Sequence, residues 1–316
     1  MAVHSPQPVF VVGSFVMACC WFTPHLPGRG EHVAATGFFM EPGGKGLNVA
    51  VGLKRLGAPV HLLLGVGRDP ARETLLALLQ QEGMADRLVH TFDGASGHGA
   101  GLIDASGEHL IVVHPGANHR LEPTHATAAR AEIADSAIVY GQFEVPDAVL
   151  TQAFRLGRQA GARTVLNPSP WRALDDALLQ HTDVLILNEH EAAALFGLDA
   201  PPTAERGDWL GPAQAWCKAH PGIELVITLG AAGCLSWAAH ADRPRHHAAR
   251  AIHAVDTTGC GDAFSAAWCV AQAQAADTDA TLRLANSAGA WLAARAGVIP
   301  ALPTLSELLA WAEPQA

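Results

Sequence analysis

Short apolar runs alternate along the chain with segments in which apolar residues recur at helical spacing. The runs are brief, rich in Leu or β-branched residues, and apolar at consecutive positions, which is typical of strands buried on both faces of a sheet. The expected strands are Val9–Val16, Val60–Leu64, Ala137–Tyr140, Thr164–Leu166, Val184–Leu187 and Leu225–Leu229. The helical segments between them are Gly46–Leu56, Ala71–Gln81, Ala148–Gln159, Glu189–Phe196 and Pro212–Ala219. This alternation predicts an α/β fold with one central, mostly parallel sheet flanked by helices.

Two stretches depart from the alternation. Glu31–Met40 and Leu88–Val113 contain strand and turn patterns without helical spacing, and they predict a small second sheet. We expect this sheet to form a lid or a dimer contact beside the main sheet. The C-terminal third is mainly helical, over Asp262–Ala275, Ala280–Ala294 and Thr304–Ala312. The chain has no internal repeat and no low-complexity tract, so residues 1–316 are expected to form a single domain.

Composition narrows the classes of function. Hydrophobic residues make up 49% of the 316 residues and charged residues only 16%, which argues against a disordered chain. The net charge is −10 and no basic run occurs, so we expect no nucleic-acid partner. No apolar run reaches the roughly 18 residues that a membrane helix needs, and the segment Val9–Phe22 lacks the preceding basic residues of a secretion signal. The six cysteines include no Cys-x-x-Cys pair, so we expect a reduced, cytoplasmic protein without a zinc site.

A first glycine-rich turn, Gly43-Gly44-Lys45-Gly46, opens a helix. Glycines at a helix start let a ligand approach the backbone, where we expect the first N–H groups of the helix to be free. Asn48 follows, and its side-chain amide both donates and accepts hydrogen bonds, which suits a ligand rich in hydroxyl groups. The turn is not a Walker A loop, because Lys45 is followed by Gly and not by Ser or Thr. An ordinary loop-to-helix turn explains the segment equally well when it is taken alone.

A second run of small residues leads into the helix that begins near Asp262. The backbone amides of Gly259, Cys260 and Gly261 are expected at the N-terminus of that helix, where they form a pocket for an anion together with the helix dipole. A carboxylate beside such a pocket suits phosphoryl transfer, because a base accepts the proton of the attacking hydroxyl while amides stabilise the transferred charge. The alternative is that Asp262 only caps the helix. That interpretation does not explain the three small residues or the second acid at Asp256.

With these two turns, the sequence resembles the ribokinase-type (PfkB) carbohydrate kinases, which phosphorylate sugars and nucleosides with ATP. The N-terminal family signature matches GGKGLNVA at Gly43–Ala50, and the C-terminal one matches DTTGCGDAF at Asp256–Phe264. Five weaker motifs follow the family's order, at residues 114–118 (HPGAN), 142–144 (QFE), 167–170 (NPSP), 188–191 (NEHE) and 228–233 (TLGAAG). The resemblance therefore covers nearly the whole chain. It implies a ribokinase-like fold with a small β lid that often mediates dimers.

The resemblance also implies a role for each matching residue. Asp262 is the catalytic base, and its anion hole consists of Gly259, Cys260 and Gly261. The residues that bind the sugar are Gly43, Gly44, Lys45, Asn48 and Glu144. The residues around the nucleotide are Asn188, Thr228, Gly230 and Asn286. Glu191 lies near Mg²⁺ and acts through water, while Asp256 and Thr258 match a loop that binds a monovalent cation such as K⁺ in many members.

The sequence departs from the family pattern at three places. Val16 and Ala18 replace the polar pair of the usual Gly-Ser-x-Asn-x-Asp run, whose Asp grips sugar hydroxyls. Losing a carboxylate removes charge-assisted hydrogen bonds worth about 1.5–3 kcal/mol, so the pocket wall becomes apolar and ribose is not the expected substrate. Cys260 stands where a smaller Ala is usual. Ala301 stands where a hydroxyl residue often helps to hold the monovalent cation.

Three other functions are alternatives to a sugar kinase. The apolar residues from Val16 to Ala18 favour a nucleoside kinase within the same class. A relative that binds sugar or nucleotide without turnover is a second alternative, but Asp262 and the intact first turn argue against it. A Rossmann dehydrogenase needs G-x-G-x-x-G after the first strand, and Gly13-Ser14-Phe15 does not supply it.

Overall fold

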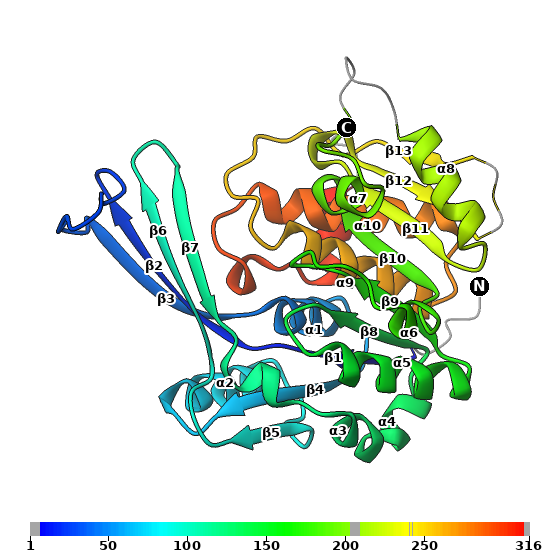
Figure 1. Ribbon diagram of the computed structural model, residues 1–316, viewed down its shortest axis with the longest axis horizontal. Coiled ribbons are helices and arrows are strands. Elements are labelled where there is room, and N and C mark those ends of the chain that lie inside the picture. Colours follow the sequence, from blue (N-terminus) through cyan, green and yellow to red (C-terminus); the bar gives the residue numbers. More distant parts are fainter. Residues whose placement is uncertain (1–6, 203–208, 240, 242, 313–316) are drawn as a thin grey trace.

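A nine-stranded sheet forms the centre of the computed structural model, which describes residues 7–202, 209–239, 241 and 243–312 (Figure 1). Its strands are β1 (Val9–Val12), β4 (Val60–Gly67), β5 (Val89–Phe92), β8 (Ile138–Gln142), β9 (Arg163–Asn167), β10 (Val184–Asn188), β11 (Glu224–Thr228), β12 (Cys234–Trp237) and β13 (Arg245–His247). They lie in the order β13-β12-β11-β10-β9-β8-β1-β4-β5. The seven strands from β11 to β5 run parallel, and β12 and β13 add an antiparallel edge. The predicted α/β fold with a mostly parallel central sheet is confirmed.

Helices cover both faces of this sheet, because successive residues of a buried strand point to opposite sides. Val9 and Val11 face one core, and Phe10 and Val12 face the other. The first core is covered by α1 (Lys45–Arg55), α2 (Pro70–Gln81), α9 (Cys260–Ala273), α10 (Thr278–Ala293) and α11 (Leu305–Ala312). The second is covered by α3 (Pro123–Ala128), α4 (Arg130–Ala134), α5 (Asp147–Ala160), α6 (Asp176–Leu179), α7 (Glu189–Leu195) and α8 (Leu210–Ala219). Short 3₁₀ turns complete the fold at η1 (Gly116–Arg120), η2 (Gly230–Ala232) and η3 (Ile299–Ala301).

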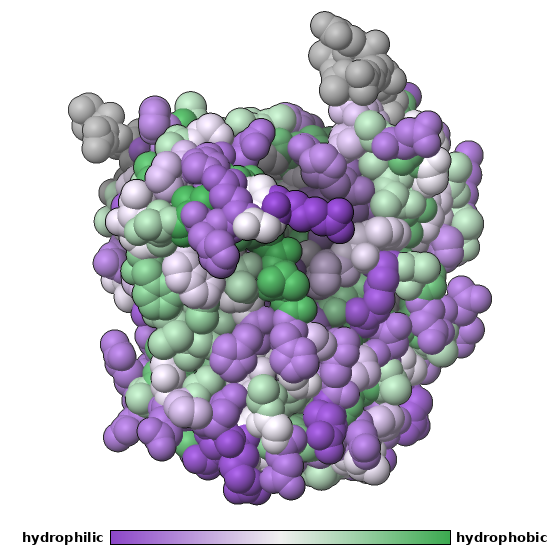
Figure 2. Space-filling view, turned by 60° about the vertical axis from the view of Figure 1, so that its left-hand side comes forward, coloured by the Kyte–Doolittle hydropathy of each residue, from purple (hydrophilic) through white to green (hydrophobic). Residues whose placement is uncertain are grey.

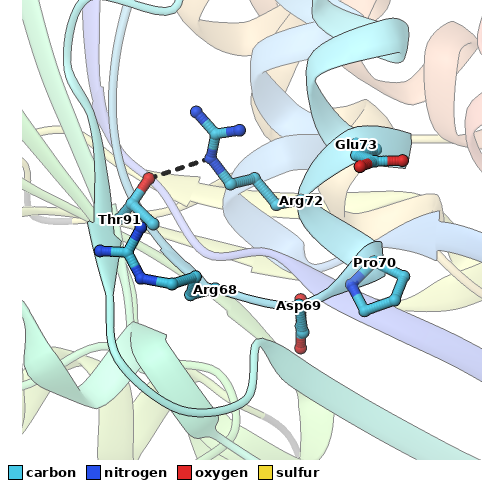
Figure 3. Close-up of a pocket in the computed structure, with 6 residues that line it drawn as sticks. All are labelled: Arg68, Asp69, Pro70, Arg72, Glu73 and Thr91. Carbon is cyan, nitrogen blue, oxygen red and sulfur yellow. Dashed lines mark hydrogen bonds between the residues drawn. The ribbon is translucent and has the colours of Figure 1, made fainter.

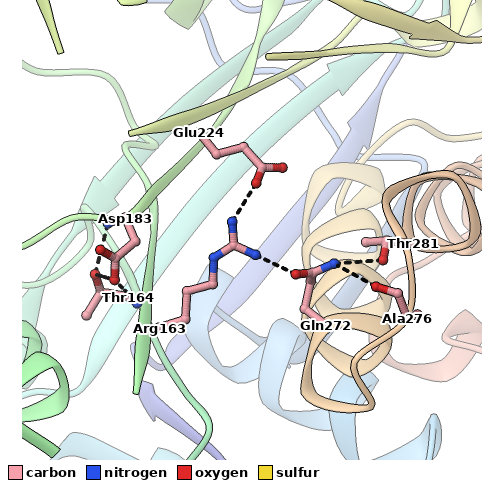
Figure 4. Close-up of polar contacts among 7 residues, drawn as sticks. All are labelled: Arg163, Thr164, Asp183, Glu224, Gln272, Ala276 and Thr281. Atoms are coloured by element: carbon pink, nitrogen blue, oxygen red, sulfur yellow. Dashed lines mark hydrogen bonds and ion pairs between the residues drawn. The ribbon is translucent and has the colours of Figure 1, made fainter. Parts of the chain in front are cut away.

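An arginine at the start of β9 anchors α9 to the sheet (Figure 4). The guanidinium of Arg163 donates to the carboxylate of Glu224 on β11 and to the side chain of Gln272 on α9. Gln272 in turn donates to the hydroxyl of Thr281 on α10 at 2.9 Å. Arg163 also lies 5.2 Å from the ring centroid of Trp268 on α9. These contacts fix the helix that carries the second glycine-rich turn.

A second sheet of four strands extends away from the main sheet, on the left of Figure 1. Its strands are β2 (Val16–Thr23), β3 (Gly37–Gly43), β6 (Gly97–Asp104) and β7 (His109–His114), in the order β3-β2-β6-β7. We call this sheet the lid. Several of its large apolar side chains are exposed: Phe22, Phe38, Met40, Leu110, Ile111, Val112 and Val113. Figure 2, with the lid side turned forward, shows green hydrophobic patches within a mainly hydrophilic surface.

The predicted strand Val9–Val16 is wrong as a single element. It breaks after Val12, and Val16 already begins the first lid strand. The break is held by Asn118, whose buried side chain accepts from the amide of Phe15 at 2.9 Å and donates to its carbonyl at 2.8 Å. A side chain occupies both backbone groups of Phe15, so the main-sheet ladder cannot continue there. The lid therefore contains a strand that begins within the apolar run predicted for the main sheet.

The predicted lid segments 31–40 and 88–113 are also corrected in part. Within the first, only Gly37–Met40 belongs to a strand, β3. Within the second, Val89–Phe92 is β5, which pairs parallel with β4 at the edge of the main sheet. The local pattern of these four residues would suit a strand of either sheet. Only their pairing with Leu64–Gly67 shows that they belong to the main sheet.

Within the described part of the chain, no helix is long and apolar enough to cross a membrane.

Candidate active site

The two glycine-rich turns meet at the starts of α1 and α9, which pack against each other. Asn48 is the fourth residue of α1, and Asp262 is the third residue of α9. The side-chain amide of Asn48 donates to Oδ2 of Asp262 at 2.8 Å, and both side chains are buried. The two signatures thus form one site, although they lie at opposite ends of the sequence.

The first turn requires glycine for reasons of space and conformation. Gly44 has φ +107°, and a Cβ there would lie 2.7 Å from the carbonyl oxygen of Ser14. At Gly46 a Cβ would lie 2.4 Å from the Cα of Gly13. A side chain at either position would therefore separate α1 from the segment that follows β1.

The N–H groups at the start of α1 are occupied, contrary to the expectation that they are free. Oε2 of Glu144 accepts from the amide of Lys45 at 2.9 Å and from the hydroxyl of Ser14 at 2.6 Å. The hydroxyl of Ser14 accepts from the amide of Gly46 at 3.1 Å, and its carbonyl accepts from the amide of Leu47 at 3.1 Å. Ser14 and Glu144 thus cap α1 from two distant segments, because helix-start donors that are buried need a partner. Glu144 and Ser14 therefore shape the turn, while Oδ1 of Asn48 has no hydrogen-bond partner among the described residues.

The second turn keeps backbone donors available. Gly259 has φ +73° and precedes α9 without a capping side chain, so Asp262 is not the helix cap. A Cβ at Gly259 would lie 2.5 Å from the side chain of Val298, which makes glycine necessary. The amide of Cys260 donates to the carbonyl of Thr257 at 3.3 Å, whereas those of Gly259 and Gly261 have no partner among the described residues. Two of the three expected anion-hole amides are therefore free in this structure.

The electrostatics of the site favour a carboxyl group that exchanges a proton near neutral pH. Burial raises the pKa of Asp262 to about 6, although the charge of Lys45 and the hydrogen bond from Asn48 lower it. The carboxylates of Glu144 and Glu191 raise it further. A base with such a pKa is largely deprotonated at pH 7 and still accepts a proton readily.

The residues expected at the nucleotide side follow the carboxyl ends of neighbouring strands. Asn188 ends β10 and pairs in register with Thr228, which ends β11. The hydroxyl of Thr228 donates to the carbonyl of Leu187 at 3.3 Å. Gly230 begins η2 with φ +53°, and the space around its Cα is open. In an open parallel sheet, ligands bind at the carboxyl ends of the strands.

Glu191, Asn188 and Asn286 also have structural partners. Asn188 and Glu191 form a capping box, in which Oδ1 of Asn188 accepts from the amide of Glu191 at 2.8 Å and Oε2 of Glu191 accepts from the amide of Asn188 at 2.9 Å. Glu191 is buried and close enough to Asp262 to raise its pKa. The side-chain amide of Asn286 donates to the carbonyls of His247 and Ala248 at 3.1 and 3.4 Å. It thereby holds the end of β13 and the residue that follows it against α10.

The loop expected to bind a monovalent cation, which contains Asp256 and Thr258, has an internal hydrogen bond. Oδ1 of Asp256 accepts from the amide of Thr258 at 2.9 Å. Glu41 of β3 approaches this loop, and its carboxylate is close enough for Asp256 to raise its pKa. Sequence reasoning assigned no role to Glu41. It also assigned none to Ser14 and Asn118, although both lie in motifs that were recognised.

A separate hollow of about 510 Å³ lies beside the start of α2 (Figure 3). Both of its arginines are already engaged: Arg68 pairs with Asp93 at 3.0 Å, and Arg72 donates to Thr91 at 3.1 Å. None of the residues lining the hollow belongs to either glycine-rich turn.

Comparison with known proteins agrees with this arrangement. The Bacillus subtilis ribokinase is 32% identical over 304 residues, which span 95% of this chain and 97% of that protein. The mouse ribokinase is 32% identical over 260 residues, or 81% of this chain and 79% of that protein. The structure of Arabidopsis thaliana ribokinase complexed with ribose and ATP superposes with a TM-score of 0.88 at 26% identity, covering 97% of this chain and 99% of that one. The sequence model of the pfkB family carbohydrate kinases matches residues 7–305, and the chain belongs to this family.

Proposed function

We propose that the protein transfers the γ-phosphoryl group of ATP to a hydroxyl of a sugar or sugar-like molecule, with Asp262 as the general base. The observation that carries the proposal is the buried carboxylate of Asp262, held by Asn48 next to the free amides of Gly259 and Gly261. The carboxylate accepts the proton of the attacking hydroxyl. The two amides and the positive end of the α9 dipole then stabilise the charge on the transferred phosphoryl group.

The acceptor is proposed to bind over the first turn. Oδ1 of Asn48 is buried and has no partner among the described residues, so it is available to a substrate hydroxyl. Because the other end of this amide holds Asp262, a hydroxyl bound here lies close to the base. Gly43, whose missing Cβ would meet only Val16 and Asn48 at 3.7 Å or more, is proposed to leave room for the sugar ring, and Gly44 to hold the turn close to Ser14 beneath it. The ammonium of Lys45 is proposed to offset negative charge. Glu144 is proposed to support acceptor binding indirectly, because its carboxylate accepts a hydrogen bond from the amide of Lys45 and so fixes the turn.

The nucleotide is proposed to bind along Asn188, Thr228 and Gly230, with its adenine ring beside Asn286. A bound Mg²⁺ would neutralise charge between the phosphates. The site suits this ion, because Mg²⁺ keeps most of its waters and needs only one or two carboxylates besides the phosphates. The buried carboxylate of Glu191 would orient such waters. Asp256 and Thr258 are proposed to hold a monovalent cation such as K⁺. Ala301 contributes no hydroxyl group to this site.

The lid is proposed to mediate a homodimer of a cytoplasmic enzyme. Leu110, Ile111, Val112 and Val113 are consecutive on β7 and more than half exposed, and β7 is an edge strand. Monomeric proteins rarely leave such an edge uncovered. Light scattering on purified protein, compared with a variant carrying Ile111→Lys and Val113→Lys on one face of β7, tests this assembly. A wild type that remains monomeric at micromolar concentration would contradict it.

A nucleoside is the second candidate acceptor. Val16 is buried and apolar at the start of β2, and Ala18 lies on the same face of the strand without a polar group, whereas Met17 faces the core. The apolar face of Val16 and Ala18 favours an acceptor with an apolar group or few hydroxyls on that side.

An ADP-release assay tests the proposal, with ATP, Mg²⁺ and a panel of pentoses, hexoses, phosphorylated sugars and nucleosides. At least one compound should accelerate ADP release well above the buffer rate, and phosphorus NMR should detect a new phosphate ester. If no compound does so while ATP and a sugar both bind in calorimetry, the protein is a non-catalytic relative and the proposal is wrong.

A further inference from the structure

The acid missing from β2 has a counterpart on the neighbouring strand. β2 and β3 pair antiparallel, and their register places Ala18 directly opposite Glu41. Directly opposed residues of an antiparallel pair point to the same face, with Cβ atoms about 4.5–5.5 Å apart. The carboxylate of Glu41 therefore rises from the same face of the lid as an Asp at position 18 would, displaced by one strand.

That face borders the active site. Gly43 lies two residues beyond Glu41 on β3, so it shares the face at about 7 Å along the strand. A Cβ at Gly43 would lie 4.0 Å from Oδ1 of Asn48, the atom proposed to receive a substrate hydroxyl. On the other side, Oε2 of Glu41 lies 3.8 Å from the position that a Cβ would take on Gly297. Glu41 thus stands between the first turn and the loops around α9.

The surroundings of Glu41 do not satisfy its charge. Its side chain is partly buried, and no hydrogen-bond or ion-pair partner for the carboxylate lies among the residues that the structure describes. Burial and the nearby charge of Asp256 raise the pKa of Glu41. Burial and the charge of Glu41 likewise raise the pKa of Cys20, which shares this face of the lid. A carboxylate in such a place costs free energy unless a donor binds to it.

We infer that Glu41 is a specificity-determining residue, which supplies from β3 the carboxylate contact to the phosphoryl acceptor that Ala18 cannot make from β2. This inference rests on the proposed kinase function. The partner of Glu41 would be a hydrogen-bond donor of the acceptor, either a hydroxyl or an amino group, on the side away from the attacking hydroxyl. The protein would then select acceptors that place a hydrogen-bond donor near Glu41 on β3. Acceptors that need a carboxylate at position 18 on β2 would be used poorly.

Glu41→Gln tests the inference, because it keeps the shape of the side chain and removes only the charge. Initial rates with ATP should show KM for the accepted sugar or nucleoside raised by about 10- to 100-fold, with KM for ATP unchanged. Comparing D-glucose with D-glucosamine distinguishes a hydroxyl from an amino partner. Glu108→Gln is the matched control, because it removes the same charge from an exposed position at the tip of the lid. It should leave both KM values within about twofold of wild type.

Moving the carboxylate across the strand pair gives a second test. Glu41→Ala should lose the preference for the accepted compound, and the double variant Glu41→Ala/Ala18→Asp should shift the preference towards D-ribose. If Glu41→Gln changes only the dependence on K⁺, Glu41 acts on the Asp256 loop and the inference is wrong. If folded Glu41→Gln keeps wild-type KM for every accepted compound, the inference also fails, while the kinase proposal stands. A wild type without turnover on the whole panel would overturn both.

Discussion

Asn48 holds Asp262 through a hydrogen bond of 2.8 Å between its side-chain amide and Oδ2 of the carboxylate, across 214 positions of sequence. One end of the Asn48 amide is spent on this bond, and the other end has no partner among the described residues. The same side chain therefore orients the proposed base and offers an acceptor to the hydroxyl that the base would deprotonate.

Asp262→Asn should lower kcat at least about 100-fold, the lower limit for loss of a general base. Asn cannot accept the proton, but its carbonyl oxygen can still accept the hydrogen bond from Asn48. The dissociation constant for ATP, measured by calorimetry, should change little. Turnover close to wild type would exclude Asp262 as the base.

The same variant should be more stable than wild type at pH 7. The folded pKa of Asp262, about 6, lies above the ordinary aspartate value of 3.8, so the folded state binds more protons than the unfolded state between these pH values. The stability of the wild type therefore falls as pH rises through this window, by about 3 kcal/mol at most. Asn carries no charge, so Asp262→Asn should raise Tm by a few degrees at pH 7 and by much less near pH 4. Equal Tm differences at both pH values would contradict this assignment.

The pH dependence of turnover should report the ionisation of Asp262. The base acts when deprotonated, so kcat should rise with pH and level off above an apparent pKa of about 6. Asn48→Ala removes a hydrogen bond that lowers this pKa, so its kcat profile should shift to higher pH. The profile is measured with saturating ATP and acceptor. A shift to lower pH in the variant would mean that Asn48 does not stabilise the charged carboxylate.

Glu191→Gln should raise the Mg²⁺ concentration needed for half-maximal activity. Gln can still accept the amide hydrogen bond of the capping box, so α7 should keep its start and the Tm should hold. Only the negative charge that would orient the water shell of the ion is lost. Asn188→Ala is the contrasting variant, because it removes the cap and should cost roughly 1 kcal/mol of stability. An unchanged Mg²⁺ titration for folded Glu191→Gln would place the metal elsewhere.

Wild type should use D-ribose poorly, because Val16 and Ala18 leave ribose hydroxyls unpaired at about 1–3 kcal/mol each. Ala18→Asp should improve kcat/KM for ribose relative to the preferred acceptor. The register also predicts a cost, because the new carboxylate lies directly opposite Glu41, and like charges at opposed positions are destabilising. Tm should therefore fall more for Ala18→Asp than for the neutral variant Ala18→Asn. Ribose use by wild type as efficient as that of any other compound would show that this wall does not discriminate.

Local sequence pattern was sufficient for most of the fold. Helical periodicity located α1, α2, α5 and α7–α11, and consecutive apolar residues located most of the parallel strands, because both signals come from neighbours within about four positions. The two glycine-rich turns were found in the same way. Their glycines are required where the chain adopts φ values near +107° and +73°. The strand β12 is not predicted by the pattern, since it is short and only the ladder beyond β11 gives it a partner.

From the sequence alone one can predict the α/β class, the two glycine-rich turns and the candidate site residues. The packed fold then shows how these residues meet: Asn48 on Asp262, Glu144 and Ser14 on the start of α1, Asn118 at the break after β1, and Glu41 opposite Ala18. These contacts could not be predicted, because they are made across sequence separations of between 23 and 214 residues. Local conformational preference carries no information at that range, and the contacts form only when buried donors and acceptors find partners in the packed fold.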